Sequence, residues 1–458
     1  MAVPPLTPAP ADGTTSNAPA VSPAGAPSQS PSLPESYRSI PILHGASFIR
    51  KMIAFAGPGY LVAVGYMDPG NWATDLGGGS RFGYTLLSAV LISSLMAIFL
   101  QALSAKLGIA TGRDLAQACR EHYSPRTSAL LWVLCEIAIA ACDLAEVLGS
   151  AVALKLLFGL PLLAGVLLTG FDVLLVLALQ GRGFRVLESL VIALILTIAG
   201  CFAYEIFFAR PLWMEAARGL LPSAEILRNR DMLYLAIGIL GATVMPHNLY
   251  LHSSIVQTRA FRLSPEGKRD AIRFATLDST LALGFSLFIN AAILVLGAAA
   301  FHVHGMNDVA DIGQAYKLLT PVLGASLASV LFAGALLCSG QNSTLTGTLA
   351  GQIVMEGFLH WQVRPWVRRL ITRSMAIIPA AIVIGVMGEG RATWLLILSQ
   401  VILSFQLPFA VVPLVQFTGD KSKMGEFANG PLTAAFAWFM AFVIIALNGA
   451  LLWLTFRA

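Results

Sequence analysis

Long apolar runs, separated by short polar segments, make up most of the chain after residue 45. Roughly eleven of these runs are long enough to cross a bilayer as helices, which takes about 17–25 residues each. By hydropathy they begin near residues 54, 83, 129, 161, 187, 232, 275, 318, 371, 394 and 432. The eighth run fades into the polar segment 339–344, so its end is the hardest to place. The pattern predicts an all-α membrane protein with eleven spans.

Two of these runs are interrupted in the middle. The first is broken by Asp-Pro-Gly-Asn at residues 68–71, and the sixth by Met-Pro-His at residues 245–247. Proline lacks a backbone N–H and its ring crowds the preceding turn, so neither run continues as a regular helix. In hydrocarbon, the carbonyls freed in this way must find partners or line a cavity. Interrupted helices at matching positions of two halves are typical of secondary transporters built from inverted repeats.

The two breaks divide the chain into repeats. They predict a ten-helix core over residues 46–425, with repeats at about 50–210 and 230–420, and an eleventh helix appended at 426–458. Residues 1–45 are expected to form a disordered cytoplasmic tail, since a stretch rich in Pro, Ala, Ser and Gly buries too little apolar surface. The tail also lacks the basic and apolar regions of a signal peptide.

The composition agrees with a polytopic membrane protein. Of the residues, 57% are hydrophobic and 12% are charged, whereas soluble domains carry about 25% charged residues. The net charge of +5 comes mainly from short loops, where basic residues set orientation rather than bind nucleic acid. The loop bias favours a cytoplasmic N-terminus and an outer C-terminus in the cell membrane, although four arginines at 210, 218, 228 and 230 run against it. We expect a monomer in the lipid bilayer, with its five cysteines as buried free thiols.

The residues at the two breaks suggest a metal site. Asp68 in mid-membrane costs roughly 2.5–3.5 kcal/mol, which argues for a functional role. Asn71 adds an amide oxygen, and Pro246 leaves the carbonyl of Ala242 without its helical partner. Met245 adds a thioether, a soft ligand that suits transition metals such as Mn²⁺ and Fe²⁺. A methionine in an apolar run more often fills the core, so the conjunction of both breaks with Asp68 carries this interpretation.

The third run contains three acids, Glu136, Asp143 and Glu146. Their spacings of seven and three place them on one helix face, which must look into the protein or a watery path. His247, beside the second break, changes charge near neutral pH. Glu136 fits equally well as the partner of another buried polar group. Structural or surface roles suit the remaining candidates better: Asp172, Glu188, Glu205, His302 and His304.

The chain resembles the Nramp family of proton-coupled divalent metal transporters over nearly its whole length after residue 50. The resemblance rests on residues 68–71 and 245–247, in that order and spacing. It extends to Gly-Thr-Leu-Ala-Gly-Gln at 347–352 and to residues 399–409, from Ser-Gln-Val through Leu-Pro-Phe. It implies the LeuT-type fold, a 5+5 inverted repeat with discontinuous helices 1 and 6.

The resemblance also implies roles for individual residues. The metal would be bound by Asp68, Asn71, the Ala242 carbonyl and Met245, with Gln400 closing over it. Gating and support would come from Pro69, Gly70, Pro246 and Asn290. The proton path would comprise Asp68, His247, Asp143 and Glu146, with Arg259 and Arg369 pairing with its acids. Family magnesium and aluminium carriers differ at the methionine position, so Met245 favours transition metals. The resemblance implies no cofactor beyond the transported metal and protons.

Other functions remain open on the sequence. A sodium-coupled symporter of small organic solutes has the same fold but no use for a set of Asp, Asn and Met ligands. A metal uniporter without strict proton coupling fits the same residues. A membrane metallohydrolase is disfavoured because the sequence has no HExxH or GxSxG motif. A metal sensor is disfavoured because no soluble output domain is recognisable.

Overall fold

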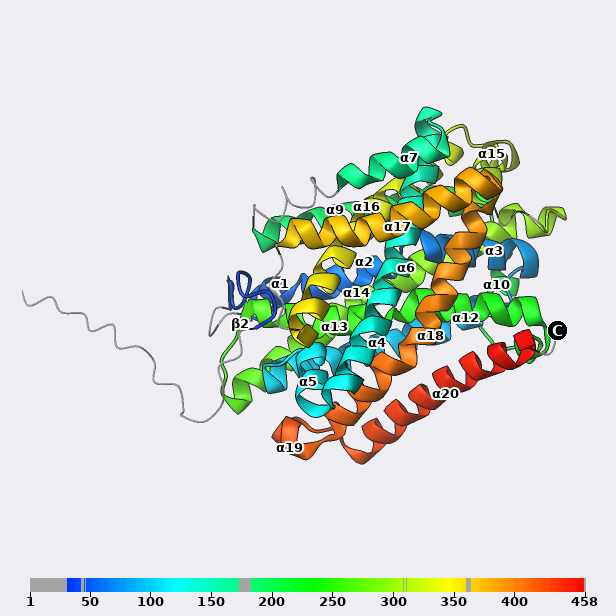
Figure 1. Ribbon diagram of the computed structural model, residues 1–458. Helices are drawn as coiled ribbons and strands as arrows, with labels where there is room; N and C mark the ends of the chain where they lie inside the picture. The colour runs from blue at the N-terminus through cyan, green and yellow to red at the C-terminus, as the bar shows by residue number, and fades with distance from the viewer. Residues whose placement is uncertain are drawn as a thin grey trace, which may run out of the picture. The chain divides into compact units, whose positions relative to one another are not determined.

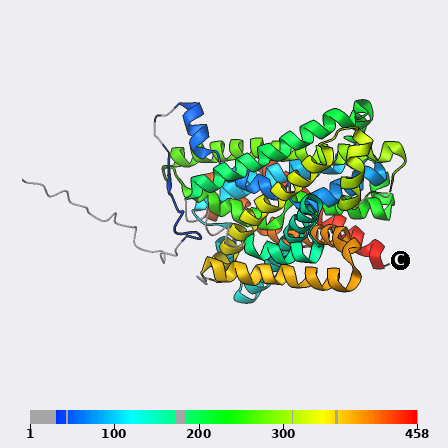
Figure 2. The ribbon, with the colours of Figure 1, turned by 90° about the horizontal axis from the view of Figure 1, so that it is seen from above.

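The computed structural model describes residues 31–42, 45, 47–172, 183–307, 309, 311–359 and 364–456. Long helices run side by side through most of this part of the chain, and one short parallel strand pair joins β1 (Ile40–Pro41) to β2 (Arg259–Ala260) (Figure 1). The last helix, α20, ends far from β1, at the opposite end of the helical bundle (Figures 1 and 2).

The described helices are, in chain order, α1 (Phe48–Phe55), α2 (Pro58–Gly65), α3 (Pro69–Phe82), α4 (Leu87–Thr111), α5 (Leu115–His122), α6 (Pro125–Phe158), α7 (Leu162–Leu168), α9 (Phe184–Ala209), α10 (Trp213–Gly219), α11 (Glu225–Arg228), α12 (Arg230–Val244), α13 (Pro246–Ile255), α14 (Pro265–Ala300), α15 (Ile312–Leu323), α16 (Ala328–Leu359), α17 (Pro365–Met387), α18 (Ala392–Gly419), α19 (Lys421–Met424) and α20 (Pro431–Phe456). Short 3-10 turns are η1 (Thr169–Phe171), η2 (Val256–Thr258), η3 (His302–His304), η4 (Glu389–Arg391) and η5 (Gly425–Phe427).

Both predicted helix breaks are present. At the first, α2 ends at Gly65 and α3 begins at Pro69, with Asp68 as the residue that caps α3. Side chains from α14 and α16 accommodate the carbonyls beside this break: Ser286 donates to Ala63 O (2.9 Å), Asn290 to Tyr66 O (2.8 Å), and Ser339 to Met67 O. The freed carbonyls are therefore paired inside the protein, as a break at membrane depth requires.

At the second break, α12 ends at Val244 and α13 begins at Pro246. Met245 lies between them with φ 29° and ψ 102°, in a region that non-glycine residues rarely adopt. Strained backbone of this kind persists only where the surrounding structure holds it, and it gathers at functional sites. Met245 is 0% exposed, so its surroundings are fully packed.

The eighth span begins later than predicted. The eighth span does not begin near residue 318: α15 ends at Leu323, where Gly324 caps it with φ 63°, and α16 begins at Ala328 and continues through the polar segment 339–344. The fourth run is described as far as residue 172, and the remainder lies outside the described residues. Among the described residues, eight helical stretches are long and apolar enough to cross a membrane, and the α1–α2 pair, bent by 46°, makes nine. The number eleven stays a prediction.

The appended helix α20 packs along α18 and α12. Within α18, Pro408 has no N–H to offer to the carbonyl of Ser404, four residues earlier. Asn448 of α20 supplies the missing donor, since its Nδ2 lies 3.0 Å from Ser404 O. The Ser404 hydroxyl in turn donates to Asn448 Oδ1 at 3.1 Å. The last helix thus completes the hydrogen bonding of α18.

The first described residues correct our view of the tail. We placed residues 1–45 in a disordered segment, but in the structure Leu33 and Ile40 are buried, with 7% and 6% of their surface exposed. Their neighbours bond to α5, α16 and β2. The Pro- and Ser-rich sequence gives no sign of this burial. Leu33 and Ile40 are buried by contacts with residues distant in the sequence, and two such side chains leave no periodic pattern.

Candidate metal site

The two helix breaks meet in the middle of the molecule. Asp68 Oδ1 accepts hydrogen bonds from the backbone N–H of Asn71 (2.8 Å) and from its side-chain Nδ2 (2.7 Å). The same Nδ2 lies 3.2 Å from Ala242 O, the carbonyl that Pro246 deprives of its helical donor. One amide group therefore bridges an acid from the first break and a main-chain oxygen from the second.

The sulfur of Met245 lies beside the first break. A Cβ atom added to Gly65 would come within 3.1 Å of Met245 Sδ, and within 2.3 Å of Asn248 Nδ2. Asn248 Nδ2 also lies 3.6 Å from the sulfur. The missing side chain at Gly65 therefore lets the two helix breaks approach closely enough to bring carboxylate, amide, carbonyl and thioether groups together.

Gln400 of α18 covers the acid. Its Nε2 lies 3.4 Å from Asp68 Oδ2 and 3.0 Å from Ser399 Oγ. Asn290 of α14 approaches from another side, with its Nδ2 3.5 Å from Asn71 Oδ1. The structure thus brings together all five residues predicted to bind metal, and each is at most 1% exposed: Asp68, Asn71, Ala242, Met245 and Gln400.

Gly70 makes room for Gln400. A Cβ atom at Gly70 would lie 1.7 Å from Gln400 Nε2, which is far inside van der Waals contact. We therefore expect Gly70→Ala to displace Gln400 and to weaken Mn²⁺ binding by about tenfold, which corresponds to ~1.4 kcal/mol. Isothermal titration of the purified protein would measure this.

A double-mutant cycle gives the control for that prediction. In a Gln400→Ala background the obstructing amide is gone, so adding Gly70→Ala should cost little further affinity. Neighbouring residues that act through one contact give non-additive effects of this kind. Equal losses from Gly70→Ala in both backgrounds would show that Gln400 is not the group displaced.

Glu146 of α6 is the centre of a polar network next to this site. Ser343 and Thr344 of α16 donate to its two carboxylate oxygens at 2.9 and 3.0 Å. The Cys142 thiol lies 3.7 Å from Oε1. A Cβ atom at Gly347 would lie 3.0 Å from Glu146 Oε1 and 3.4 Å from Asp143 Oδ1, so both acids face the same point on α16.

His247 connects the metal site to these acids. It is the second residue of α13, next but one to Met245, and is 1% exposed. It lies close enough to Asp143 for the two groups to interact electrostatically. Glu136, further along α6, accepts a hydrogen bond from Trp132 Nε1 at 3.1 Å. The acid face predicted for the third run therefore points into the protein.

Arg373 is a functional candidate that our sequence reasoning missed. Its guanidinium reaches Glu146 Oε2 at 3.4 Å and Asp172 Oδ2 at 2.9 Å, and it is 1% exposed. We had assigned this role to Arg369, which lies one turn earlier on α17 and whose side chain lies outside the described residues. An arginine flanked by Leu-Ile-Thr and followed by a long apolar run was the signal that could have identified Arg373.

Arg259 makes a different ion pair from the one we expected. Its Nη1 lies 2.7 Å from Glu188 of α9, with both side chains buried. Its Nη2 donates to the carbonyls of Phe55 and Ala56 at 3.2 and 2.8 Å. Arg259 therefore ties the end of α1 to α9, and Glu188, which we regarded as a structural acid near a span edge, is its carboxylate partner.

A second hydrogen-bonded chain closes the site on the side facing α4, and the sequence did not predict it. Gln101 of α4 donates to Tyr66 OH at 2.8 Å, and its Oε1 lies 3.0 Å from His252 Nδ1. The Tyr66 hydroxyl lies 3.5 Å from Val244 O. These residues tie α2, α4 and α13 together just beyond the two breaks.

In the described part of the chain, histidine and cysteine do not assemble a separate metal centre. No group of three or more His, Cys, Asp or Glu able to hold a metal occurs among the residues that the structure describes. In the predicted outer loop, His302 and His304 each place Nδ1 near a backbone carbonyl, of Ser80 and Ala300, at 3.0 and 3.1 Å. The Asp68 site has one carboxylate, and its other donors are neutral. Such a site can bind a cation and still release it.

Known proteins match nearly the whole chain. The family model described as Nramp, natural resistance-associated macrophage protein-like, matches residues 59–454. The divalent metal cation transporter MntH of Nostoc sp. is 61% identical over 426 residues, covering 93% of this chain and 96% of that protein. MntH of Bradyrhizobium diazoefficiens is 61% identical over 421 residues, covering 92% and 94%.

Solved structures point the same way. A crystal structure of the manganese transporter of Eremococcus coleocola matches with a TM-score of 0.84 and 40% sequence identity, covering 91% of this chain and 90% of that one. The inward-facing conformation of Mhp1 matches with a TM-score of 0.56 at 14% identity, covering 94% of each chain. The second likeness concerns the fold alone.

Proposed function

Because this chain belongs to the Nramp family, we propose that it imports divalent transition metal ions, Mn²⁺ and Fe²⁺ among them, at the Asp68 site and couples this to proton movement. The chain has the LeuT-type all-α fold, embedded in a membrane, and is a transporter rather than an enzyme. The observation that carries the proposal is the convergence of Asp68, the Ala242 carbonyl and Met245 from two broken helices.

Metal binding would require one local rearrangement. Asn71 Nδ2, an N–H donor, lies between Asp68 Oδ1 and Ala242 O, and a cation between the same two oxygens would be repelled by that donor. Turning the amide would bring Asn71 Oδ1 toward the ion. Asn290 Nδ2 lies near both Tyr66 O and Asn71 Oδ1 and would support the backbone while this happens. The ion would then meet one acid, two neutral oxygens and one sulfur.

The proton path would begin at Asp68. An arriving divalent cation stabilises an ionised carboxylate at close range, so a proton held by Asp68 would be released. His247 is the nearest titratable group on the second break, and Asp143 and Glu146 lie beyond it on α6. Arg373 would balance the charge of Glu146 and Asp172. We keep Arg259 and Arg369 in the proposed path as cations acting near its far end.

Alternating access would involve the two closures that flank the ion. Gln400 covers Asp68 on one side, while Tyr66, Gln101 and His252 tie α2, α4 and α13 on the other. Secondary transporters of this architecture move one set of helices against the rest around a fixed site. We propose that the Gln400 side faces outward, with the N-terminus cytoplasmic, the C-terminus outside, and the protein acting as a monomer in the cell membrane.

Uptake into proteoliposomes tests this function. Purified protein would be reconstituted with a pH dye inside, and Mn²⁺, Fe²⁺, Mg²⁺, Ca²⁺ and an amino-acid panel would be offered in turn. We expect Mn²⁺ and Fe²⁺ uptake with internal acidification, and little transport of the others. Protein-free vesicles give the leak, and an ionophore gives the response of the dye.

The outcomes separate the alternatives. Metal uptake without acidification would favour a uniporter. Sodium-dependent uptake of an organic solute, with no metal transport, would favour the symporter of the same fold. Either result would contradict the proposal as stated, and the second would also remove the role assigned to Met245.

A further inference from the structure

The segment before the first helix crosses one face of the molecule. At one end, Ser32 Oγ donates to Asp114 Oδ2 of the α5 cap at 2.6 Å, and the backbone N–H of Leu33 donates to Glu356 Oε2 of α16 at 3.0 Å. The side chain of Leu33 is buried in the same apolar cluster as residues of α5 and α16. This end is therefore attached to the helices around the proposed proton path.

The other end of the segment is attached to the chain that follows α13. β1 pairs in parallel with β2, with Ile40 opposite Arg259 and Pro41 opposite Ala260. Arg38 adds a backbone N–H bond to Gln257 O at 2.9 Å and a guanidinium bond to Phe261 O at 2.8 Å. This end is thus attached to the chain just after α13, whose first residue follows Met245 directly.

The two ends span a seam between α13 and α16. Phe358 of α16 packs against Tyr250 of α13 with ring centroids 5.7 Å apart. Gly347, Val354 and Phe358 follow one another along the same face of α16, with spacings of seven and four. Gly347 faces Glu146 and Asp143. The seam between α13 and α16 therefore runs from these two acids to the Tyr250–Phe358 pair, next to the segment before the first helix.

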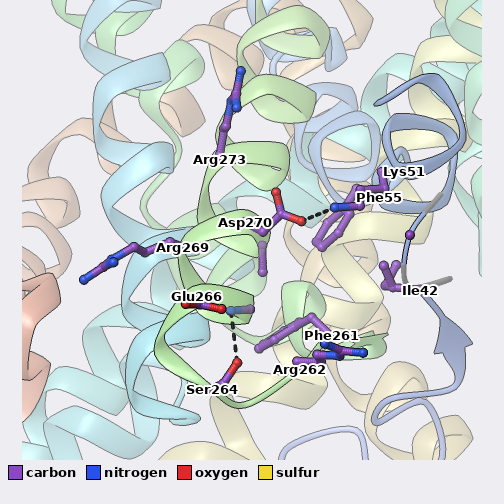
Figure 3. A pocket seen from close by; sticks show the side chains of 13 residues that line it. Ile42, Lys51, Phe55, Phe261, Arg262, Ser264, Glu266, Arg269, Asp270 and Arg273 are labelled. Carbon is purple, nitrogen blue, oxygen red and sulfur yellow. Dashed lines mark hydrogen bonds and ion pairs between the residues drawn. The ribbon is translucent and has the colours of Figure 1, made fainter. Parts of the chain in front are cut away.

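The helix that follows the segment borders a cavity. A cavity of about 540 Å³ lies between α1 and the start of α14, lined by residues that include Ile42, Phe55 and Phe261 (Figure 3). Lys51 of α1 crosses to Asp270 of α14 at 2.5 Å, as Figure 3 shows. The contacts of α1 with α14 therefore lie at the edge of this cavity, next to the segment.

We infer that residues 32–41 form a strap that holds the seam between α13 and α16 closed, and that Ser32 and Leu33 must leave α5 and α16 before the ion is released on this face. The inference rests on the proposed function for the meaning of release. The strap depends on the contacts of Ser32 and Leu33 with the α5 cap and α16. Its opening can be measured without a transport assay.

The contacts at the two ends of the strap indicate which end detaches. The Arg38–Pro41 end is held by strand pairing and by backbone carbonyls, which do not depend on one side chain. The Ser32 end covers an acid: burial raises the pKa of the Asp114 carboxyl to about 6, although the Ser32 hydroxyl acts in the opposite direction. One hydroxyl and one backbone N–H make the hydrogen bonds of this end. Leu33 and Arg38 both have positive φ, 63° and 51°, so backbone strain is present at both ends and the number of bonds distinguishes them.

A buried reporter tests the strap directly. Val354→Cys introduces a thiol at a position that is 0% exposed, and its labelling rate by a water-soluble maleimide measures opening of the seam. We expect Ser32→Ala with Leu33→Ala to speed labelling by about tenfold, equivalent to ~1.4 kcal/mol in the opening equilibrium. Ser32→Ala alone should give a smaller increase, and the parent without Val354→Cys gives the background from native cysteines.

The matched control lies in the same segment. Glu35 is exposed, so Glu35→Ala should leave the labelling rate unchanged. Equal labelling of the double variant and the Glu35→Ala control would overturn the strap. This readout is separate from metal transport: if the parent moves no metal, the proposed function fails while the labelling result still stands or falls by itself.

A disulfide tests the choice of end. Pro41→Cys with Ala260→Cys places two cysteines on paired positions of β1 and β2, where neighbouring strands lie about 4.8 Å apart, within reach of a disulfide. Because this end stays attached, we expect the oxidised and reduced forms to label at Val354→Cys and to take up Mn²⁺ at equal rates. Loss of uptake on oxidation, restored by reductant, would show that the wrong end has been assigned as the releasing one.

Discussion

Replacing Asp68 by Asn should abolish metal transport while leaving the protein folded. Asp68 is the one carboxylate among the predicted ligands, and a unit charge about 4 Å from a cation contributes on the order of 4 kcal/mol at an effective dielectric constant of ~20. The loss corresponds to a decrease in uptake of at least roughly 100-fold. Isotopic Mn²⁺ uptake into proteoliposomes, with thermal unfolding recorded in parallel, would measure both effects.

The capping role of Asp68 makes Asn the right substitution. Asp68 caps α3 by accepting the N–H of Asn71, and Asn caps helices about as well as Asp, so the helix start should survive. Asp420, half-buried, caps α19 by accepting the N–H of Ser422 and gives the matched control. Asp420→Asn should transport normally. Retained Mn²⁺ uptake with normal acidification in Asp68→Asn would remove this residue from both proposed roles.

Met245→Ala should widen the range of ions that compete with Mn²⁺. Thioether sulfur binds soft transition metals and gives nothing to Ca²⁺ or Mg²⁺, which take oxygen ligands. Removing the Met245 thioether should weaken Mn²⁺ binding and leave the oxygen ligands in place. We expect the ratio of Mn²⁺ to Ca²⁺ affinity to fall by about tenfold, or ~1.4 kcal/mol, as measured by Ca²⁺ competition in uptake assays.

The control for this substitution is another buried methionine. Met440 of α20 is 5% exposed and lies in the apolar core, so Met440→Ala removes the same side chain far from the two breaks. It should lower thermal stability without altering ion selectivity. If Met245→Ala kept the parent's Ca²⁺ competition, the sulfur would be a packing group and selectivity would have to come from the oxygens.

The parts of the site that sequence reasoning found are those with a local chemical cause. Pro69 and Pro246 cannot continue a helix, and this fixes where the backbone opens and which carbonyl, that of Ala242, loses its partner. Asp68 in an apolar run has few explanations besides function. The position of these groups follows from covalent geometry, so no knowledge of neighbouring helices was needed.

The parts that were missed depend on helix phase and on contacts distant in the sequence. Arg369 and Arg373 are one turn apart and equally plausible by charge, and the packing of α17 against α6 buries Arg373 beside Glu146. Arg259 finds Glu188, 71 residues away. Gly324 ends α15 through its left-handed conformation, a local choice that hydropathy does not register.

The bond from Asn448 to Ser404 has a consequence for how this protein is handled. A truncation before residue 431 would keep both proposed repeats but remove Asn448. The carbonyl of Ser404, one turn from Gln400, would then lack its hydrogen-bond donor inside the membrane. An affinity tag or fusion partner at the C-terminus is therefore attached to the helix that stabilises α18, and α18 carries Gln400 over the metal site. Such tags are better placed before Ser32.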